Sequence, residues 1–424
     1  MKVPLKFRLN DTSKSIATLV TGTSIAQMVN VIGIPILSRV YDPVAVGLLA
    51  VYVSAASIFS VFAAGRYELA IILPTDASEA VKIKALAQWI VIVTSVASCI
   101  FLFLFMHPVS SLFNLEGYRQ WLPGISALIF LSGFMNIMNY WYTRQKKFKI
   151  QSINKVILST SVLVFQVLFG IFISNDLTSL LLGLISGQAL AVIFLISQQG
   201  LGISQQILHF GDARKLMRKY IKMPLVNGPN ALVDSVRMNG LNFIIASVSA
   251  SSLGQFSMAL RGVQAPVGLF SQAISQVFLQ KMAHEGRGYL YPMVLTIVRK
   301  GLLLAFFPFL LVFLISPQLF PMLLGSGWEL SGYFAQALVP WLYLNVVTSP
   351  LANIFIVTQT QGRLLTFAVF YMLVPLIVIY SLKSDILLAV WGLSLSMAGM
   401  LLIQIFLAIF TARSYDAKRG KVGL

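Results

Sequence analysis

The sequence has little charge and a single cysteine. Charged residues make up 10% of its 424 residues and hydrophobic residues 58%, whereas a soluble domain has about 25% charged residues. This composition excludes a soluble globular chain and predicts an integral membrane protein. Cys99 alone cannot form a disulfide framework or a thiolate metal site, and we expect it to be a packing residue in its apolar run.

Histidine is scarce as well. His107, His209 and His284 lie in three different gaps between apolar runs, so they form no metal or acid–base cluster. The gaps are also short, which disfavours a membrane-embedded glycosyltransferase or polymerase. We therefore do not expect an enzyme, and we expect no cofactor and no metal.

The positive charge is explained by membrane topology rather than by nucleic acid. The formal net charge is +18, but the basic residues occur in small groups between apolar runs, and no basic patch interleaved with aromatic residues is present. We expect no nucleic-acid partner.

Apolar windows of about 20 residues or more, bounded by charged residues or Pro/Gly clusters, predict membrane helices. The windows are residues 14–40, 44–74, 83–106, 120–143, 151–174, 178–198, 220–248, 252–280, 292–316, 330–358, 363–381 and 385–411. The expected fold class is an all-α polytopic membrane protein with about twelve transmembrane helices.

Basic residues are concentrated in alternate gaps, and basic residues near span ends stay in the cytoplasm. One set of gaps, together with the adjoining span ends and the two ends of the chain, holds Lys2, Lys6, Arg8, Lys14, Lys82, Lys84, Arg144, Lys146, Lys147, Lys149, Arg214, Lys215, Arg218, Lys219, Lys222, Lys281, Arg287, Arg299, Lys300, Arg363, Arg413, Lys418, Arg419 and Lys421. The other gaps and their adjoining span ends hold only Arg39, Arg119 and Lys383. Both termini are predicted to be cytoplasmic.

A weak internal repeat divides the chain into halves of six spans. "VYDPVAVGLLAVY" resembles "SVSASSLGQFSMA", pairing Gly47 with Gly254, and "TRQKKFK" resembles "TQTQGRLL", pairing Gln145 with Gln361. Chance similarity is an alternative for matches this short. Parallel repeats are typical of many alternating-access transporters. We expect an N-lobe at residues 1–200, a cytoplasmic connection at 201–222, a C-lobe at 223–412 and a cytoplasmic tail at 413–424.

Four charged residues stand well inside predicted spans, where an ionisable side chain costs a few kcal/mol and normally faces a cavity or a partner. They are Glu68, Asp234, Arg237 and Arg261, and Arg66 lies near the end of the second span. Asp234 and Arg237 are spaced i, i+3, so they can pair. The stretch "LVNGPNALVDSVRMNGLNF" therefore places an ion pair near the middle of the membrane.

Polar side chains accompany these charges on four helices. Helical spacing puts Asn227 and Asn230 on the same face as Asp234 and Arg237. Similar stripes are Arg261, Gln264, Gly268, Ser271, Gln272 and Ser275 on the eighth span; Ser24, Gln27 and Asn30 on the first; and Ser57, Ser60, Ala64, Tyr67 and Glu68 on the second. The functional polarity is thus expected in the first two helices of each half.

Two structural interpretations compete with a functional one. Ser, Asn, Gln and Gly at helix interfaces also form hydrogen bonds and close contacts that only hold helices together. The Asp234 and Arg237 pair can equally be a structural ion pair. Arg261 has no acidic partner within its helix, which favours a cavity that binds anions.

The segment from Gly22 to Pro74 resembles the start of bacterial polysaccharide-transport proteins, the O-antigen and lipid-linked oligosaccharide flippases. These belong to the multidrug/oligosaccharidyl-lipid/polysaccharide exporter superfamily. The specific motifs are "LSRVYDP...G" and "RYELAIILP", and the resemblance is strong over about the first 85 residues. Over the rest of the chain the resemblance rests on topology, on length and on the motifs "TRQKKFK" and "TQTQGR" at the ends of the fourth and tenth spans.

The resemblance implies two six-helix lobes around a central cationic cavity. It implies a substrate of undecaprenyl diphosphate carrying an oligosaccharide, moved from the cytoplasmic to the periplasmic leaflet of the bacterial inner membrane. Membrane lipids, a polysaccharide polymerase and a chain-length regulator are the further partners expected.

A diphosphate needs Arg partners, so Arg237 and Arg261 are the candidates for its contacts, with Arg66 met first on the cytoplasmic side. Asp234 and Glu68 would hold these Arg side chains or bind a coupling ion, either a proton or sodium. Sugar hydroxyls would meet Asn227, Asn230, Gln27, Asn30 and Gln264.

A multidrug exporter of the same superfamily is the alternative function. Its cavity should be acidic and aromatic, because its substrates are organic cations. The charges inside the spans here sum to basic, which favours the flippase.

Overall fold

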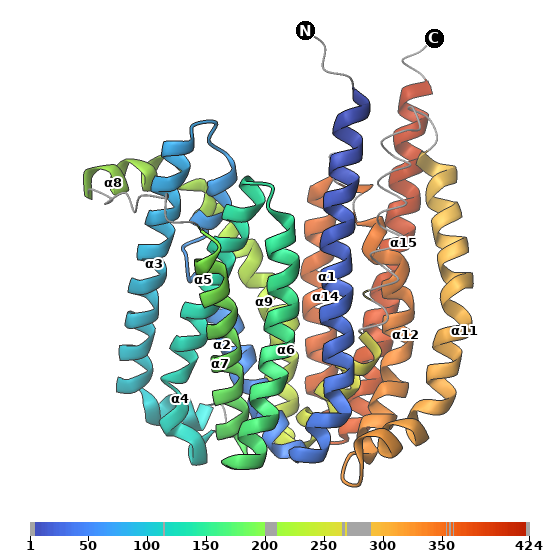
Figure 1. The fold of residues 1–424 in the computed structure, drawn as a ribbon. Coiled ribbons are helices and arrows are strands. Elements are labelled where there is room, and N and C mark those ends of the chain that lie inside the picture. Colours follow the sequence, from blue (N-terminus) through green and yellow to red (C-terminus); the bar gives the residue numbers. More distant parts are fainter. Residues whose placement is uncertain are drawn as a thin grey trace. The chain divides into compact units, whose positions relative to one another are not determined.

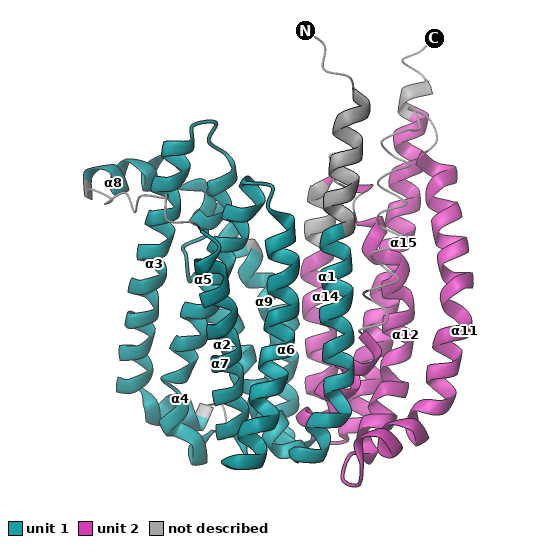
Figure 2. Ribbon diagram, viewed as in Figure 1, with its two compact units in different colours: residues 1–251 teal, residues 252–424 magenta. Residues whose placement is uncertain are grey.

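The computed structural model describes residues 5–112, 115–199, 210–264, 268, 290–352, 354–355, 358 and 360–420. All regular elements in these ranges are helices (Figure 1). The all-α fold class is therefore confirmed. The chain divides into two compact units, unit 1 at Met1–Ser251 and unit 2 at Ser252–Leu424 (Figure 2).

Within the described residues, helices lie in each of the twelve predicted spans, and residues 265–267 and 269–280 of the eighth span lie outside the described residues. Unit 1 contains α1 (Leu5–Val40), α2 (Pro43–Ser60), η1 (Tyr67–Ile72), α3 (Ala77–Leu104), α4 (Met106–Leu112), η2 (Glu116–Trp121), α5 (Gly124–Arg144), α6 (Phe148–Phe172), α7 (Leu177–Ser197), α8 (Phe210–Lys219), η3 (Met223–Asn227) and α9 (Gly228–Val248). A helical segment at 250–264 leads into unit 2. Unit 2 continues with α11 (Leu290–Leu324), α12 (Glu329–Leu351), α14 (Gln361–Ser381) and α15 (Ile386–Gly420).

Seven of the described helices are long and apolar enough to cross a membrane on length and composition alone: α1, α2, α3, α6, α7, α11 and α15. α12 is not among them, and it is largely surrounded by protein. Buried residues line it from Ser331 to Leu351, and its Trp341 indole donates to the Tyr371 hydroxyl at 2.9 Å. A helix covered by other helices needs no apolar surface toward lipid.

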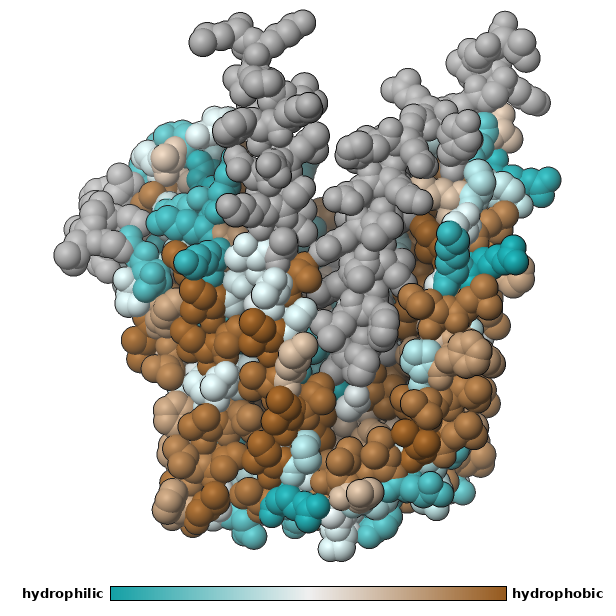
Figure 3. Space-filling view, turned by 45° about the vertical axis from the view of Figure 1, so that its right-hand side comes forward, coloured by the Kyte–Doolittle hydropathy of each residue, from teal (hydrophilic) through white to brown (hydrophobic). Residues whose placement is uncertain are grey.

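Apolar side chains cover much of the face seen in Figure 3. Unit 1 exposes Phe103, Leu104 and Phe172, and unit 2 exposes Phe307 and Phe406. This is the pattern of a chain whose solvent is lipid. Cys99 also lies exposed, on α3, so the expectation that it packs inside is wrong: its stretch of α3 presents an apolar face outward.

Three aspartates set the starts of helices in unit 1. The Asp42 carboxylate accepts a hydrogen bond from the backbone N–H of Ala45 at 2.8 Å, and Pro43 follows as the first residue of α2. Asp76 and Asp176 cap α3 and α7 in the same way. An aspartate at this position satisfies backbone N–H groups that lack partners inside the helix. α3 therefore begins at Ala77, before the apolar window does.

The second predicted span is not one helix. α2 ends at Ser60, and turns lead to η1. Gly65 has φ of 57° and Arg66 has φ of 61°, a left-handed conformation that an α-helix cannot contain. The predicted stripe from Ser57 to Glu68 is therefore wrong beyond Ser60.

Glycines bring α6 and α7 into close contact. A Cβ added at Gly187 would lie 2.5 Å from Val162 Cγ2, and one at Gly183 would lie 2.6 Å from the Gln166 backbone nitrogen. The two glycines are four residues apart on one face of α7, the spacing that allows helix backbones to approach in membranes.

α9 packs with unit 1, against α2. Its Asn242 amide donates to the Ser54 hydroxyl at 2.8 Å, and a Cβ at Gly228 would lie 2.7 Å from a ring carbon of Phe62. The compact units thus divide after Ser251, one helix later than the repeat. The lobe boundaries drawn from the repeat stay a prediction.

Candidate functional site

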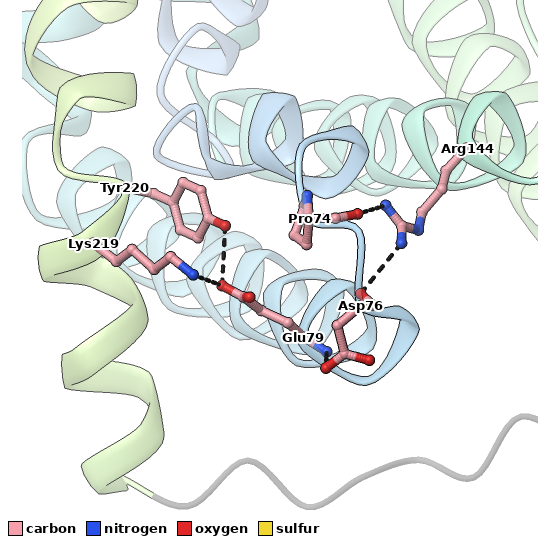
Figure 4. Close-up of polar contacts among 6 residues, drawn as sticks. All are labelled: Pro74, Asp76, Glu79, Arg144, Lys219 and Tyr220. Atoms are coloured by element: carbon pink, nitrogen blue, oxygen red, sulfur yellow. Dashed lines mark hydrogen bonds and ion pairs between the residues drawn. The ribbon is translucent and has the colours of Figure 1, made fainter.

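Arg144 holds the turn that follows η1. Its guanidinium donates to the backbone carbonyl oxygen of Ile71 at 3.2 Å. It also donates to those of Pro74 at 2.6 Å and Asp76 at 3.2 Å (Figure 4). A planar guanidinium with five donors suits several carbonyls at once. The motifs "RYELAIILP" and "TRQKKFK" therefore meet, with the second fixing the end of the first.

The segment before α9 is fastened to the same end of unit 1. The Lys219 ammonium and the Tyr220 hydroxyl both donate to the Glu79 carboxylate (Figure 4). Glu79 raises the pKa of Lys219 above its ordinary value through this hydrogen bond. The Tyr67 hydroxyl, in η1, donates to the Met217 carbonyl of α8 at 3.3 Å. The end of α8 and Tyr220, shortly before α9, are thus tied to Tyr67, the neighbour of Arg66, and to Glu79.

Arg66 and Glu68 form an ion pair. The Arg66 Nη1 and Glu68 Oε1 atoms lie 3.6 Å apart, and the Glu68 side chain is only 6% exposed. In a continuous helix, residues two apart project about 200° from each other, so Arg66 and Glu68 would point to different sides. The left-handed turn at Arg66 instead brings the two side chains together. Arg66 Nε and Glu68 Oε2 are buried and have no hydrogen-bond partner among the described residues.

A polar cavity of about 340 Å³ lies within unit 1, and Arg66 lines it. α2, α5 and α7 contact one another around it. Its polar lining comes from Ser57, Ser60, Arg66, Ser132, Asn136 and Gln188, and Leu128 and Leu184 are among its apolar lining residues. The cavity collects hydrogen-bonding groups from three helices.

The charged pair on α9 forms as expected. Arg237 Nη2 and Asp234 Oδ1 lie 3.3 Å apart, with the Asp234 side chain 69% exposed and that of Arg237 22%. Asn227 lies in η3, where its amide contacts the Met223 sulfur at 3.4 Å. Asn230 belongs to α9, but its side chain lies outside the described residues.

The remaining candidates lie apart from these groups along the chain. Gln27 is half-buried and Asn30 exposed on α1. Arg261 and Gln264 are exposed in the helical segment of unit 2, and Arg261 has no ion-pair partner among the described residues. Ser271, Gln272 and Ser275 of the same predicted stripe lie outside the described residues.

Ser132, Asn136 and Gln188 are not among the residues predicted from the sequence. The predicted polarity was confined to the first two helices of each half, whereas these residues are uncharged and lie on α5 and α7, which carry no mid-span charge. Helical spacing does put Ser132 and Asn136, four residues apart, on one face of α5. That signal was present in the sequence, but the packing of α5 against α2 and α7 was not.

Several solved structures share this fold. An inward-facing multidrug resistance MATE family transporter of the MOP superfamily has a TM-score of 0.72 and 14% identity, over 96% of each chain. The inward closed conformation of the lipid II flippase MurJ has a TM-score of 0.73 and 14% identity, over 93% of this chain and 87% of that one.

A MOP superfamily transporter from Pyrococcus furiosus, described by the reverse polarity of its binding pocket, gives a TM-score of 0.58 and 13% identity over 95% and 96% of the chains. No curated protein matches the sequence significantly. Residues 36–332 match the family described as polysaccharide biosynthesis protein. The chain is a multi-pass membrane protein with the fold of MOP superfamily transporters, and it belongs to the polysaccharide biosynthesis protein family.

Proposed function

We propose that the protein is a flippase for undecaprenyl-diphosphate-linked oligosaccharide repeat units. It moves them from the cytoplasmic to the periplasmic leaflet of the bacterial inner membrane by alternating access, for O-antigen or another surface polysaccharide. Both termini are cytoplasmic in this proposal. It acts beside a polysaccharide polymerase and a chain-length regulator.

The match to the polysaccharide biosynthesis family carries this proposal. The MOP transporter fold supports a transport role over an enzymatic one. The excess of arginine over acid inside the spans supports an anionic substrate, because a diphosphate binds guanidinium groups strongly away from water.

The arginines take the roles that this substrate requires. Arg237 and Arg261 contact the diphosphate, and Arg66 is met first from the cytoplasmic side. Asn227, Asn230, Gln27, Asn30 and Gln264 contact sugar hydroxyls.

Arg237→Ala and Arg261→Ala test these roles. Each variant should abolish surface polysaccharide in a strain that lacks the native gene, while the protein remains in the membrane at normal levels. Arg→Lys variants should restore little, because lysine cannot form a bidentate contact with a phosphate.

Arg119→Ala and Arg299→Ala, at exposed positions outside the proposed site, are the matched controls and should leave polysaccharide unchanged. Full polysaccharide in both Arg237→Ala and Arg261→Ala would contradict the anion-binding role.

A coupling ion, proton or sodium, is the second part of the proposal. Asp234 is the better candidate because its carboxylate is exposed, whereas that of Glu68 is buried against Arg66. Asp234→Asn should remove the dependence of transport on the ion gradient. If transport by this variant still depended on the ion gradient, Asp234 would be excluded as the coupling site.

A multidrug exporter is the second candidate function, because a multidrug resistance MATE transporter shares the fold of this protein. A strain without the protein would then become sensitive to cationic drugs. We expect unchanged drug sensitivity and lost surface polysaccharide instead.

A further inference from the structure

We propose that the cavity between α2, α5 and α7 is a binding site for one neutral sugar ring of the transported glycan. This inference rests on the proposed function and adds a second contact site, separate from the arginines Arg237 and Arg261. It assigns roles to Asn136, Ser132 and Gln188.

The cavity has unused hydrogen-bonding capacity. Ser60, Ser132 and Asn136 line it, and their side chains make no hydrogen bond within the described part of the chain. Gln188 Oε1 and Arg66 Nε are buried without partners there. Buried polar groups without partners are unfavourable, so such a group calls for a ligand or water. Gln188 Oε1 accepts a hydrogen bond and Arg66 Nε donates one. A hydroxyl group of a ligand can form a hydrogen bond with either atom.

The charges around the cavity favour a neutral ligand. Arg66 is the one charged residue among the described residues that line it, and Glu68 lies against the Arg66 guanidinium at 3.6 Å. Glu68 offsets the charge of Arg66, so the cavity holds no anion or cation, and the diphosphate only passes Arg66 on entry. A ligand that both donates and accepts hydrogen bonds without charge is matched to this lining.

Size and apolar surface point to a single ring. The volume of about 340 Å³ lies at the lower end of the roughly 300–1,000 Å³ of small-molecule sites. Leu128, Leu184, Val53 and Ala56 supply apolar surface for the C–H faces of a sugar ring. An oligosaccharide would fill the cavity with one residue and extend beyond it.

Saturation-transfer NMR tests the site directly. Purified protein is placed in phospholipid nanodiscs free of sugar-based detergent, with glucose, N-acetylglucosamine or glucuronate as probes. We expect transfer to the ring protons of the two neutral sugars and no stronger transfer to glucuronate. Asn136→Leu and Gln188→Met should reduce the transfer at least fivefold, because each keeps side-chain volume and removes hydrogen bonds.

Gln198→Met is the matched control. Gln198 is exposed just after α7 and lies outside the cavity, so the variant should bind the neutral sugars like the native protein. All variants should keep the native melting temperature, which separates loss of binding from loss of fold. Equal transfer in every variant, transfer to glucuronate alone, or no transfer at all would overturn the sugar site.

The sugar-binding measurement is independent of the polysaccharide measurement that tests the proposed function. Arg237→Ala should lose surface polysaccharide yet keep sugar binding in the cavity. If sugars bind but polysaccharide persists in the arginine variants, the flippase mechanism fails and the site stands. If polysaccharide is lost but no sugar binds, the site fails and the flippase stands.

Discussion

Arg66 has the least common backbone conformation among the residues of the candidate site. Its positive φ aims the side chain at a cavity on one side and at Glu68 on the other. Removing the guanidinium leaves a buried carboxylate with no charged partner, which is unfavourable by about 3–5 kcal/mol for a fully buried pair. The Arg66 side chain is 24% exposed, so the effect should be smaller.

We predict that Arg66→Ala lowers the free energy of unfolding by about 2 kcal/mol. Adding Glu68→Gln should recover most of this loss, because the buried charge is then absent. Thermal unfolding in detergent measures both variants. Surface polysaccharide should stay low in the double variant, since the guanidinium is still missing. A double variant no more stable than Arg66→Ala would argue against the ion pair.

At the scale of elements, the contact between α6 and α7 depends on two glycines. Gly183→Ala and Gly187→Ala each place a methyl group within 2.6 Å or less of α6 atoms, including backbone. Overpacking of this kind typically costs about 1–3 kcal/mol, so we predict a lower melting temperature for each variant. Gly399→Ala in α15 is the control, because nothing lies within 4 Å of its added Cβ. Unchanged melting in all three variants would show that α6 can move away at no cost.

The turn after η1 depends on Arg144. Because Arg144 supplies donors to several carbonyls of residues 71–76, Arg144→Ala should leave this turn without its clamp. We predict faster hydrogen–deuterium exchange in the peptide that covers residues 67–76, with little change elsewhere. Arg119→Ala serves as the comparison, and exchange that is equal in both variants would mean that the clamp is dispensable.

Helix positions followed from the sequence more fully than the turns did. Apolar runs mark where the helices lie. The starts of α2, α3 and α7 were not predicted, because the capping by Asp42, Asp76 and Asp176 is seen only in the structure. The break after Ser60 did not follow, because "FAAGRYE" continues the apolar pattern and only Gly65 hints at a turn. Periodicity reports which face of a helix is polar, whereas backbone conformation depends on contacts such as those of Arg144.

At the scale of the whole molecule, the basic loops predict its orientation. Alkaline phosphatase is active only outside the cytoplasm, so a fusion after Gly420 should be inactive. A fusion at Lys383, in the gap between α14 and α15, should be active. The reverse result would invert the topology and the direction of transport together.

The family and the fold class could be read from the sequence, whereas the full site could not. Motifs of the first 85 residues identify the family, and composition identifies the membrane. The charged pair on α9 followed from spacing along one helix. The cavity lined by Asn136 and Gln188 did not, because it exists only where α2, α5 and α7 pack together. Helix-to-helix packing is set by side chains far apart in sequence.

The central claim is that the protein moves lipid-linked glycans across the membrane. The most direct measurement is the leaflet distribution of undecaprenyl-diphosphate-linked repeat units, labelled at the glycan in inside-out and right-side-out vesicles. In cells that lack the protein, the glycans should be accessible only on the cytoplasmic face, and the native chain should restore them to the periplasmic face. The same distribution with and without the protein would contradict the account.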